Sequence, residues 1–125
     1  MTAKLPPSVL SFTVDPFTEE DFSPVDAEKV IAGTPRQAFR VLYTSASEDF
    51  CTGIYACTPG KWRVSYTEDE FCTLTSGSIT LTNADGDIVQ RFNAPDSFLI
   101  PSGFSGTWEA LTAVQKNFVI YEKTG

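Results

Sequence analysis

The most informative gap in this sequence is histidine, which occurs at none of its 125 positions. Without an imidazole, the chain cannot build a Ser-His-Asp or Cys-His nucleophile system, an imidazole general base or a histidine-ligated metal site. Any acid–base chemistry must therefore use carboxylates, lysines, tyrosines or thiols.

Cysteine, long apolar runs and positive charge are also scarce. Cys51, Cys57 and Cys72 are an odd number of cysteines at spacings that match no zinc-ligand pair, and we interpret them as buried thiols. The longest apolar runs, such as residues 98–100, are far too short to span a bilayer. The net charge of −7 makes nucleic acid and anionic membranes unfavourable partners, because the long-range attraction has the wrong sign.

The chain length predicts one domain with a single core. The first seven residues contain no apolar stretch of signal-peptide length, so we expect a cytoplasmic protein. Residues 1–37 are rich in proline and acids and carry isolated apolar side chains. We expect them to form an extended arm that packs on the domain of residues 38–125 or on a neighbouring subunit, and this arm is our reason for expecting a homodimer.

From residue 38 onward the pattern predicts an all-β fold. Short runs rich in Val, Ile, Thr, Tyr and Phe alternate with turns that contain Gly, Pro, Asn and Asp. Their spacing favours a sandwich or barrel over βαβ units, and the clearest hairpin has Gly86 in its turn. The expected strands cover residues 38–46, 50–57, 61–66, 70–76, 78–83, 88–93, 96–100, 105–110 and 114–122.

The stretch 60–77 carries the candidate chemistry. An aromatic–aliphatic row shares one face of its first strand, and three consecutive acids, residues 68–70, lead into the next strand. Carboxylates at such a position are costly unless they line a cavity or have a role. The row consists of Trp62, Val64 and Tyr66.

Two motifs of the chain resemble the conserved motifs of the cupin superfamily. The first begins at Pro59-Gly60, passes through Asp69-Glu70-Phe71 and ends at Gly77, and the second reads Pro101-Ser-Gly-Phe-Ser-Gly-Thr-Trp108. Over residues 50–121 the chain is similar to small cupins related to (S)-ureidoglycine aminohydrolase and to the ethanolamine-utilisation cupins. The resemblance implies a single-domain, RmlC-like jelly-roll β-barrel with the N-terminal arm in front of it.

The metal ligands of such cupins are largely missing from the matching positions. The resemblance implies two histidines and a glutamate in the first motif and one histidine in the second, where this chain has Val64, Tyr66, Glu70 and Gly106. One carboxylate with neighbouring hydroxyls is a poor site for a transition metal. We therefore expect neither a metal nor another cofactor, and we do not expect the metal-dependent hydrolase chemistry of the relatives.

Strand parity and the resemblance together predict a pocket with aromatic walls. Glu70 and Tyr66 are the candidate catalytic acid–base pair, and Lys116 is the candidate partner for the inward carboxylate. A purely structural Glu70–Lys116 pair stays open, as does the interpretation that each aromatic only fills the barrel interior. The expected ligand-binding residues are Trp62, Cys72, Phe98, Trp108 and Lys116.

These features predict a metal-free protein that binds a small polar metabolite, with nitrogen-containing compounds as the first candidates. Two alternatives stay open. One is an aminohydrolase- or isomerase-like enzyme in which Glu70 and Tyr66 act as acid and base. The other is a structural dimerisation module with a closed barrel, in which the N-terminal arm is the functional surface.

Overall fold

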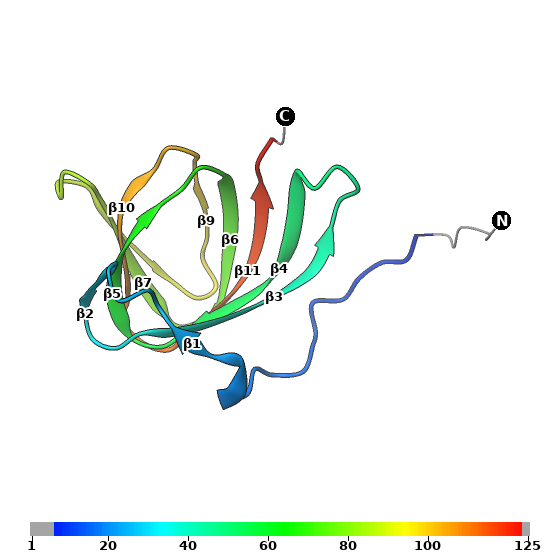
Figure 1. Ribbon diagram of the computed structural model, residues 1–125, viewed down its shortest axis with the longest axis horizontal. Coiled ribbons are helices and arrows are strands. Elements are labelled where there is room, and N and C mark those ends of the chain that lie inside the picture. Colours follow the sequence, from blue (N-terminus) through cyan, green and yellow to red (C-terminus); the bar gives the residue numbers. More distant parts are fainter. Residues whose placement is uncertain (1–6, 124–125) are drawn as a thin grey trace.

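The computed structural model describes residues 7–123 and is built almost entirely from antiparallel β-strands (Figure 1). A single turn of 3-10 helix, η1, precedes the strands. The elements are η1 (Glu19–Asp21), β1 (Ser23–Pro24), β2 (Val30–Ala32), β3 (Arg36–Thr44), β4 (Phe50–Cys57), β5 (Gly60–Ser65), β6 (Asp69–Ser76), β7 (Ser78–Asn83), β8 (Val89–Asn93), β9 (Ser97–Ile100), β10 (Ser105–Ala110) and β11 (Val114–Tyr121).

The strands form two sheets that face each other across the core. The six-stranded sheet has the order β1-β3-β4-β11-β6-β9, and the five-stranded sheet has the order β2-β5-β10-β7-β8. The chain passes repeatedly from one sheet to the other, as expected for a jelly roll. Within residues 7–123 no ladder joins the two sheets, so they form an open sandwich in place of the barrel that the resemblance implied.

A sharp turn at Gly77 carries the chain from one sheet to the other. Gly77 lies between β6 and β7 with a φ of 89°, a conformation that favours glycine. A Cβ atom at this position would lie 2.2 Å from the carbonyl oxygen of Ala113. The chain leaves the six-stranded sheet at this turn and enters the five-stranded one, and only glycine fits there without strain.

The nine predicted strands are all present, each with its ends within two residues of the expected positions. The hairpin of β7 and β8 is confirmed, and Gly86 in its turn has a φ of 80°. The sequence did not predict β1 and β2, which lie inside the expected arm and pair with β3 and β5.

The end of the N-terminal segment packs on the chain's own six-stranded sheet. The guanidinium of Arg40 lies 4.9 Å from the ring centroid of Phe17, and its Nη1 donates a hydrogen bond of 2.9 Å to the carbonyl oxygen of Asp15. On this face, which turns away from the second sheet, Ala38 and Ile54 are buried. Residues 15–22 therefore act as a cover for β3.

The core lies between the sheets and consists mainly of apolar and aromatic side chains, with one acid and one lysine buried among them. No helix within the described residues is long and apolar enough to cross a membrane. The buried hydrophobic residues of the central cluster are Val25, Cys57, Trp62, Cys72, Leu74, Ile79, Leu81, Phe98, Ile100, Trp108, Ala110 and Val114.

Candidate functional site

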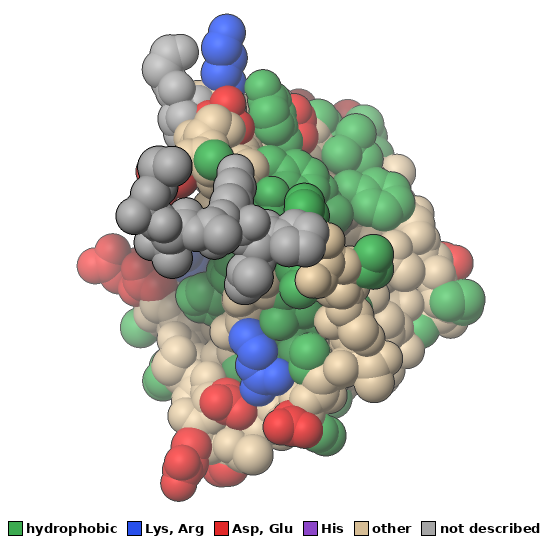
Figure 2. All heavy atoms as spheres, turned by 90° about the vertical axis from the view of Figure 1, so that its right-hand side faces the viewer, with side chains coloured by type: hydrophobic (Ala, Val, Ile, Leu, Met, Phe, Trp, Pro, Cys, Tyr) green, Lys and Arg blue, Asp and Glu red, His purple; other side chains and the backbone are tan. Residues whose placement is uncertain are grey.

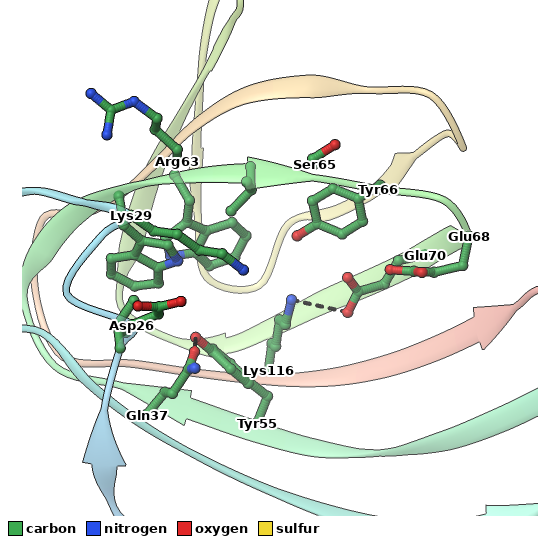
Figure 3. Close-up of a pocket in the computed structure, with 14 residues that line it drawn as sticks. Asp26, Lys29, Gln37, Tyr55, Arg63, Ser65, Tyr66, Glu68, Glu70 and Lys116 are labelled. Carbon is green, nitrogen blue, oxygen red and sulfur yellow. Dashed lines mark hydrogen bonds and ion pairs between the residues drawn. The ribbon is translucent and has the colours of Figure 1, made fainter.

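A cavity of about 300 Å³ lies between the two sheets, near the turn that joins β1 to β2 (Figure 3). Both sheets contribute to its walls, and the β5–β6 loop forms one side of it. Its volume is at the low end for ligand pockets, which suits a small metabolite. The lining residues are Val25, Asp26, Lys29, Gln37, Tyr55, Trp62, Arg63, Val64, Ser65, Tyr66, Glu68, Glu70, Trp108 and Lys116.

A buried ion pair between β6 and β11 forms part of this lining. Nζ of Lys116 lies 3.1 Å from Oε2 of Glu70, and the two side chains are only 4% and 8% exposed. The ammonium also lies 4.8 Å and 4.6 Å from the ring centroids of Tyr55 and Trp108. The pairing expected from strand parity is therefore present, and two aromatic rings add cation–π attraction to it.

Lys116 is charged at neutral pH despite its burial. Burial acts to lower the pKa of its ammonium, but Cys72, Glu70 and Tyr66 raise it, and the net result is a pKa above the ordinary value. Nζ also donates a hydrogen bond of 3.4 Å to Sγ of Cys72, whose own pKa is raised by burial to about 12. Because an ammonium has three N–H donors, one remains for a further acceptor.

Tyr66 presents a hydroxyl group to the cavity (Figure 3). Burial raises the pKa of this phenol, so it is protonated at neutral pH and can donate a hydrogen bond. Among residues 7–123 no hydrogen bond reaches the hydroxyl group. The backbone of Tyr66 is held by the second motif, because its N–H donates to the carbonyl oxygen of Phe104 and its own carbonyl oxygen accepts from the N–H of Gly103.

The two tryptophans of the motifs meet in the cavity wall. The ring centroids of Trp62 and Trp108 are 6.4 Å apart, and Tyr55 lies edge-on to Trp108 at the same centroid distance. The indole N–H of Trp108 is buried and has no hydrogen-bond partner among the described residues. Five predicted site residues thus share the cavity: Trp62, Tyr66, Glu70, Trp108 and Lys116.

Two predicted ligand-binding residues lie outside the cavity. Cys72 has no exposed surface and does not line the cavity, and its Sγ accepts a hydrogen bond from Nζ of Lys116, which does. Phe98 stacks on Phe92 at a centroid distance of 4.4 Å and lines a separate cavity of about 220 Å³. Its inward parity was predicted correctly, but parity does not tell which part of the interior a side chain reaches.

Several lining residues were not predicted from the sequence. The hydroxyl group of Tyr55 donates a hydrogen bond of 2.7 Å to Oε1 of Gln37, across β4 and β3. Asp26 and Lys29 reach the cavity from the turn between β1 and β2. The alternation in β4 could have indicated Tyr55, whereas nothing in the sequence links that turn to the cavity.

The residues at the cupin metal-ligand positions do not fit a metal. A Cβ atom at Gly106 would lie 1.9 Å from the carbonyl oxygen of Thr82, so no ligand side chain can be placed there on this backbone. Val64 has no donor atom, and Glu70 is already paired with the ammonium of Lys116. Residues 7–123 contain no group of three or more His, Cys, Asp or Glu side chains that could hold a metal ion.

Comparison with known families gives a match to the EutQ-like cupin domain over residues 44–118. No match was found among curated proteins. Among solved structures, a DUF861-family protein of unknown function from Pseudomonas syringae pv. tomato is 20% identical, with a TM-score of 0.70. The alignment covers 78% of this chain but only 42% of that protein.

Two ethanolamine-utilisation proteins show the same fold. The EutQ protein of Clostridium difficile is 12% identical, with a TM-score of 0.61 over 70% of this chain and 63% of that one. A putative ethanolamine utilisation protein Q from Salmonella typhimurium is 18% identical, with a TM-score of 0.59 over 80% of this chain and 93% of that one. This chain thus spans less than two thirds of the first two structures, and such low identities bear on the fold alone.

Proposed function

Because this chain belongs to the EutQ-like cupin family, we propose that it binds a small, polar, nitrogen-containing metabolite in the cavity between its sheets, without a metal ion. The observation that carries the proposal is a group of three polar side chains in the cavity lining, Tyr66, Glu70 and Lys116, with unused hydrogen-bonding capacity. We call these three residues the polar floor of the cavity. Glu70 uses one carboxylate oxygen for Lys116, and the Tyr66 hydroxyl group has no partner among the described residues.

The charges of this floor favour a neutral ligand group over a charged one. Glu70 and Lys116 neutralise each other, so an added charge would be buried without a counterion of its own. The second oxygen of Glu70 can accept a hydrogen bond from the ligand, while the third N–H of Lys116 and the hydroxyl group of Tyr66 can each donate one to it. A group that carries a donor and an acceptor side by side, such as an amide or ureide, satisfies both.

The walls and rim complete the description of the ligand. Trp62 and Trp108 line the cavity and offer it apolar ring surface for a planar group. Asp26, Lys29 and Glu68 put charges of both signs into the lining near the cavity rim, so polar substituents of either sign have a partner there. A compact polar molecule with one planar amide-like end matches this combination.

The proposal is tested by ligand-induced thermal shifts of metal-depleted protein, screened against amides, ureides, amines, amino acids and sugars. The best compound is then titrated calorimetrically into the wild type and into Tyr66→Phe. We expect at least about 10-fold weaker binding to this variant, about 1.4 kcal/mol, because one hydrogen bond is lost.

Tyr121→Phe is the matched control, since it removes the same hydroxyl group from a tyrosine that is exposed and lies outside the cavity. Its affinity should equal that of the wild type. A screen without any stabilising compound would contradict the proposal, and so would equal binding by Tyr66→Phe.

A further inference from the structure

A second cavity, of about 400 Å³, lies on the outer side of β5 and β10 in the five-stranded sheet. Along β5, Arg63 and Ser65 have the opposite parity to the buried Trp62 and face away from the core. Figure 3 shows both side chains on the side of β5 opposite to Glu70 and Lys116. We call this space the outer cavity. Its polar lining residues are Lys29, Arg63, Ser65, Asn83, Ser105 and Thr107.

Two cross-strand pairs bring the hydrogen-bond donors of the outer cavity together. In the ladder of β5 and β10, Arg63 lies directly opposite Thr107, and Ser65 lies directly opposite Ser105. The Cα atoms of paired residues are about 5 Å apart, and two positions along a strand span about 7 Å. Four donor side chains therefore surround a patch that is small enough for one oxyanion to contact both strands.

Most donors of the outer cavity are unused within residues 7–123. The guanidinium of Arg63 makes one long hydrogen bond, of 3.5 Å, to the carbonyl oxygen of Glu28, and no ion pair. The ammonium of Lys29 also lacks an ion pair there, while its carbonyl oxygen accepts a hydrogen bond of 2.9 Å from the N–H of Arg63. Three hydroxyl groups form no hydrogen bond among the described residues, those of Ser65, Ser105 and Thr107. These donors have capacity for a ligand.

The outer cavity is positively charged in a chain that is strongly negative. Its lining contains Lys29 and Arg63 but no Asp or Glu, whereas the chain has 9 basic and 16 acidic residues. Asp87, in the neighbouring β7–β8 turn, accepts a hydrogen bond of 2.8 Å from Asn83 and does not line the cavity. The opposite side of the molecule, that of β3 and β4, shows only scattered Lys and Arg side chains (Figure 2). Two cations in one cavity, against a net charge of −7, favour an anionic ligand.

We propose that the outer cavity binds the phosphate group of a small ligand. Arginine presents a rigid fork of N–H donors that fits two phosphate oxygens at once, and Arg63 has this role. The hydroxyl groups of Ser65, Ser105 and Thr107 add donors from other directions, which suits the tetrahedral oxygens of phosphate better than a planar carboxylate. The volume leaves room for a small organic part beside the phosphate. Lys29 and residues 63–65 line both cavities, but the polar floor lines only the first, so the two ligands have different binding groups.

The test is a titration of isotope-labelled protein with inorganic phosphate and with glycerol 3-phosphate at constant ionic strength, followed by the NMR shifts of the backbone amides. Both probes should give saturable shifts at residues 63–65 and 105–107. Tighter binding of glycerol 3-phosphate would assign the site to a phosphorylated metabolite, and equal or tighter binding of inorganic phosphate would assign it to the free ion. Arg63→Gln should weaken binding at least about 10-fold, because charge-assisted hydrogen bonds are lost.

The matched control is Arg91→Gln, which removes the same charge from β8 of the same sheet, outside the outer cavity. Its affinity should stay within about two-fold of the wild type, because distant exposed charges are screened. Thr107→Val leaves the net charge unchanged and should weaken binding at least about 3-fold, so it tests the site even if Arg63→Gln does not fold. Shifts that do not saturate, equal losses for the two arginine variants, or acetate bound as tightly as phosphate would overturn the proposal.

Discussion

The ammonium of Lys116 lies 3.1 Å from Oε2 of Glu70, and both groups are almost wholly removed from solvent. The pair joins β11 to β6 and forms part of the polar floor of the cavity. The chain has no histidine, and the one carboxylate that it has at a cupin metal-ligand position, Glu70, is paired with a lysine of the same chain. The stability of the core and the protonation of Lys116 therefore depend on the same two side chains on which the proposed ligand binding rests.

Removal of one partner of this pair should cost more than removal of both. Glu70→Gln leaves the ammonium of Lys116 buried without its counterion, so the free energy of unfolding should fall by about 3–5 kcal/mol. Glu70→Gln/Lys116→Met should lose less than either single change. Urea denaturation of the four proteins gives the coupling energy, and strictly additive losses would mean that the pair does not form.

Stability should fall above about pH 9. Burial raises the pKa of Cys57 to about 11 and that of Cys72 to about 12, from 9.0, and the pKa of Lys116 is also raised. The unfolded chain then releases these protons first, so the stabilising contribution is complete below pH 9 and is lost as the pH rises toward the folded-state values. Unfolding curves between pH 8 and 11 measure this loss.

The thiol part of this dependence can be isolated with Cys72→Ala. The variant should show a shallower decline of stability above pH 9 than the wild type, whatever its absolute stability at pH 8. A stability that is flat or rises from pH 8 to 11 is incompatible with the buried thiols of the structure.

Gly106→Ala should strongly destabilise the protein, because the new Cβ atom would lie 1.9 Å from the carbonyl oxygen of Thr82. We expect a loss of about 2–4 kcal/mol, measured by urea denaturation. Gly86→Asn is the control: its turn has open space, and asparagine tolerates a positive φ. Equal losses for both variants would show that β10 and β7 are further apart than the structure places them.

The cover formed by residues 15–22 should loosen when Arg40 is replaced by alanine. The change removes the contact with the Phe17 ring and the hydrogen bond to Asp15, at a cost of about 1 kcal/mol. Limited proteolysis should then cut within residues 7–22 faster than in the wild type. Arg91→Ala, on β8 of the other sheet, should leave the cleavage rate unchanged.

Strands and inward faces could be predicted from the sequence because alternation is local. The alternation of residues in the expected strands 61–66 and 114–122 was enough to place Trp62, Tyr66 and Lys116 inside. Which inward side chains share a cavity depends on pairing between distant strands, so the sequence did not show that Phe98 lines a different cavity, and it did not indicate Tyr55.

The N-terminal part was predicted least well. β1 and β2 have only two and three residues, too few for any periodic pattern, and their pairing with β3 and β5 is tertiary. Asp26 and Lys29 lie between β1 and β2, so their approach to the cavity depends on the same tertiary pairing. The expected barrel is an open sandwich, because whether the edges of the two sheets pair with each other depends on contacts between strands far apart in the sequence.

The most direct test of the account is a thermal-shift titration of metal-depleted wild-type protein with amide- and ureide-containing compounds, repeated after addition of manganese, nickel or zinc. We predict that one compound class raises the melting temperature without metal, and that added metal does not increase the effect. Stabilisation that requires a metal ion would contradict the central claim that Glu70, Lys116 and Tyr66 bind the ligand directly.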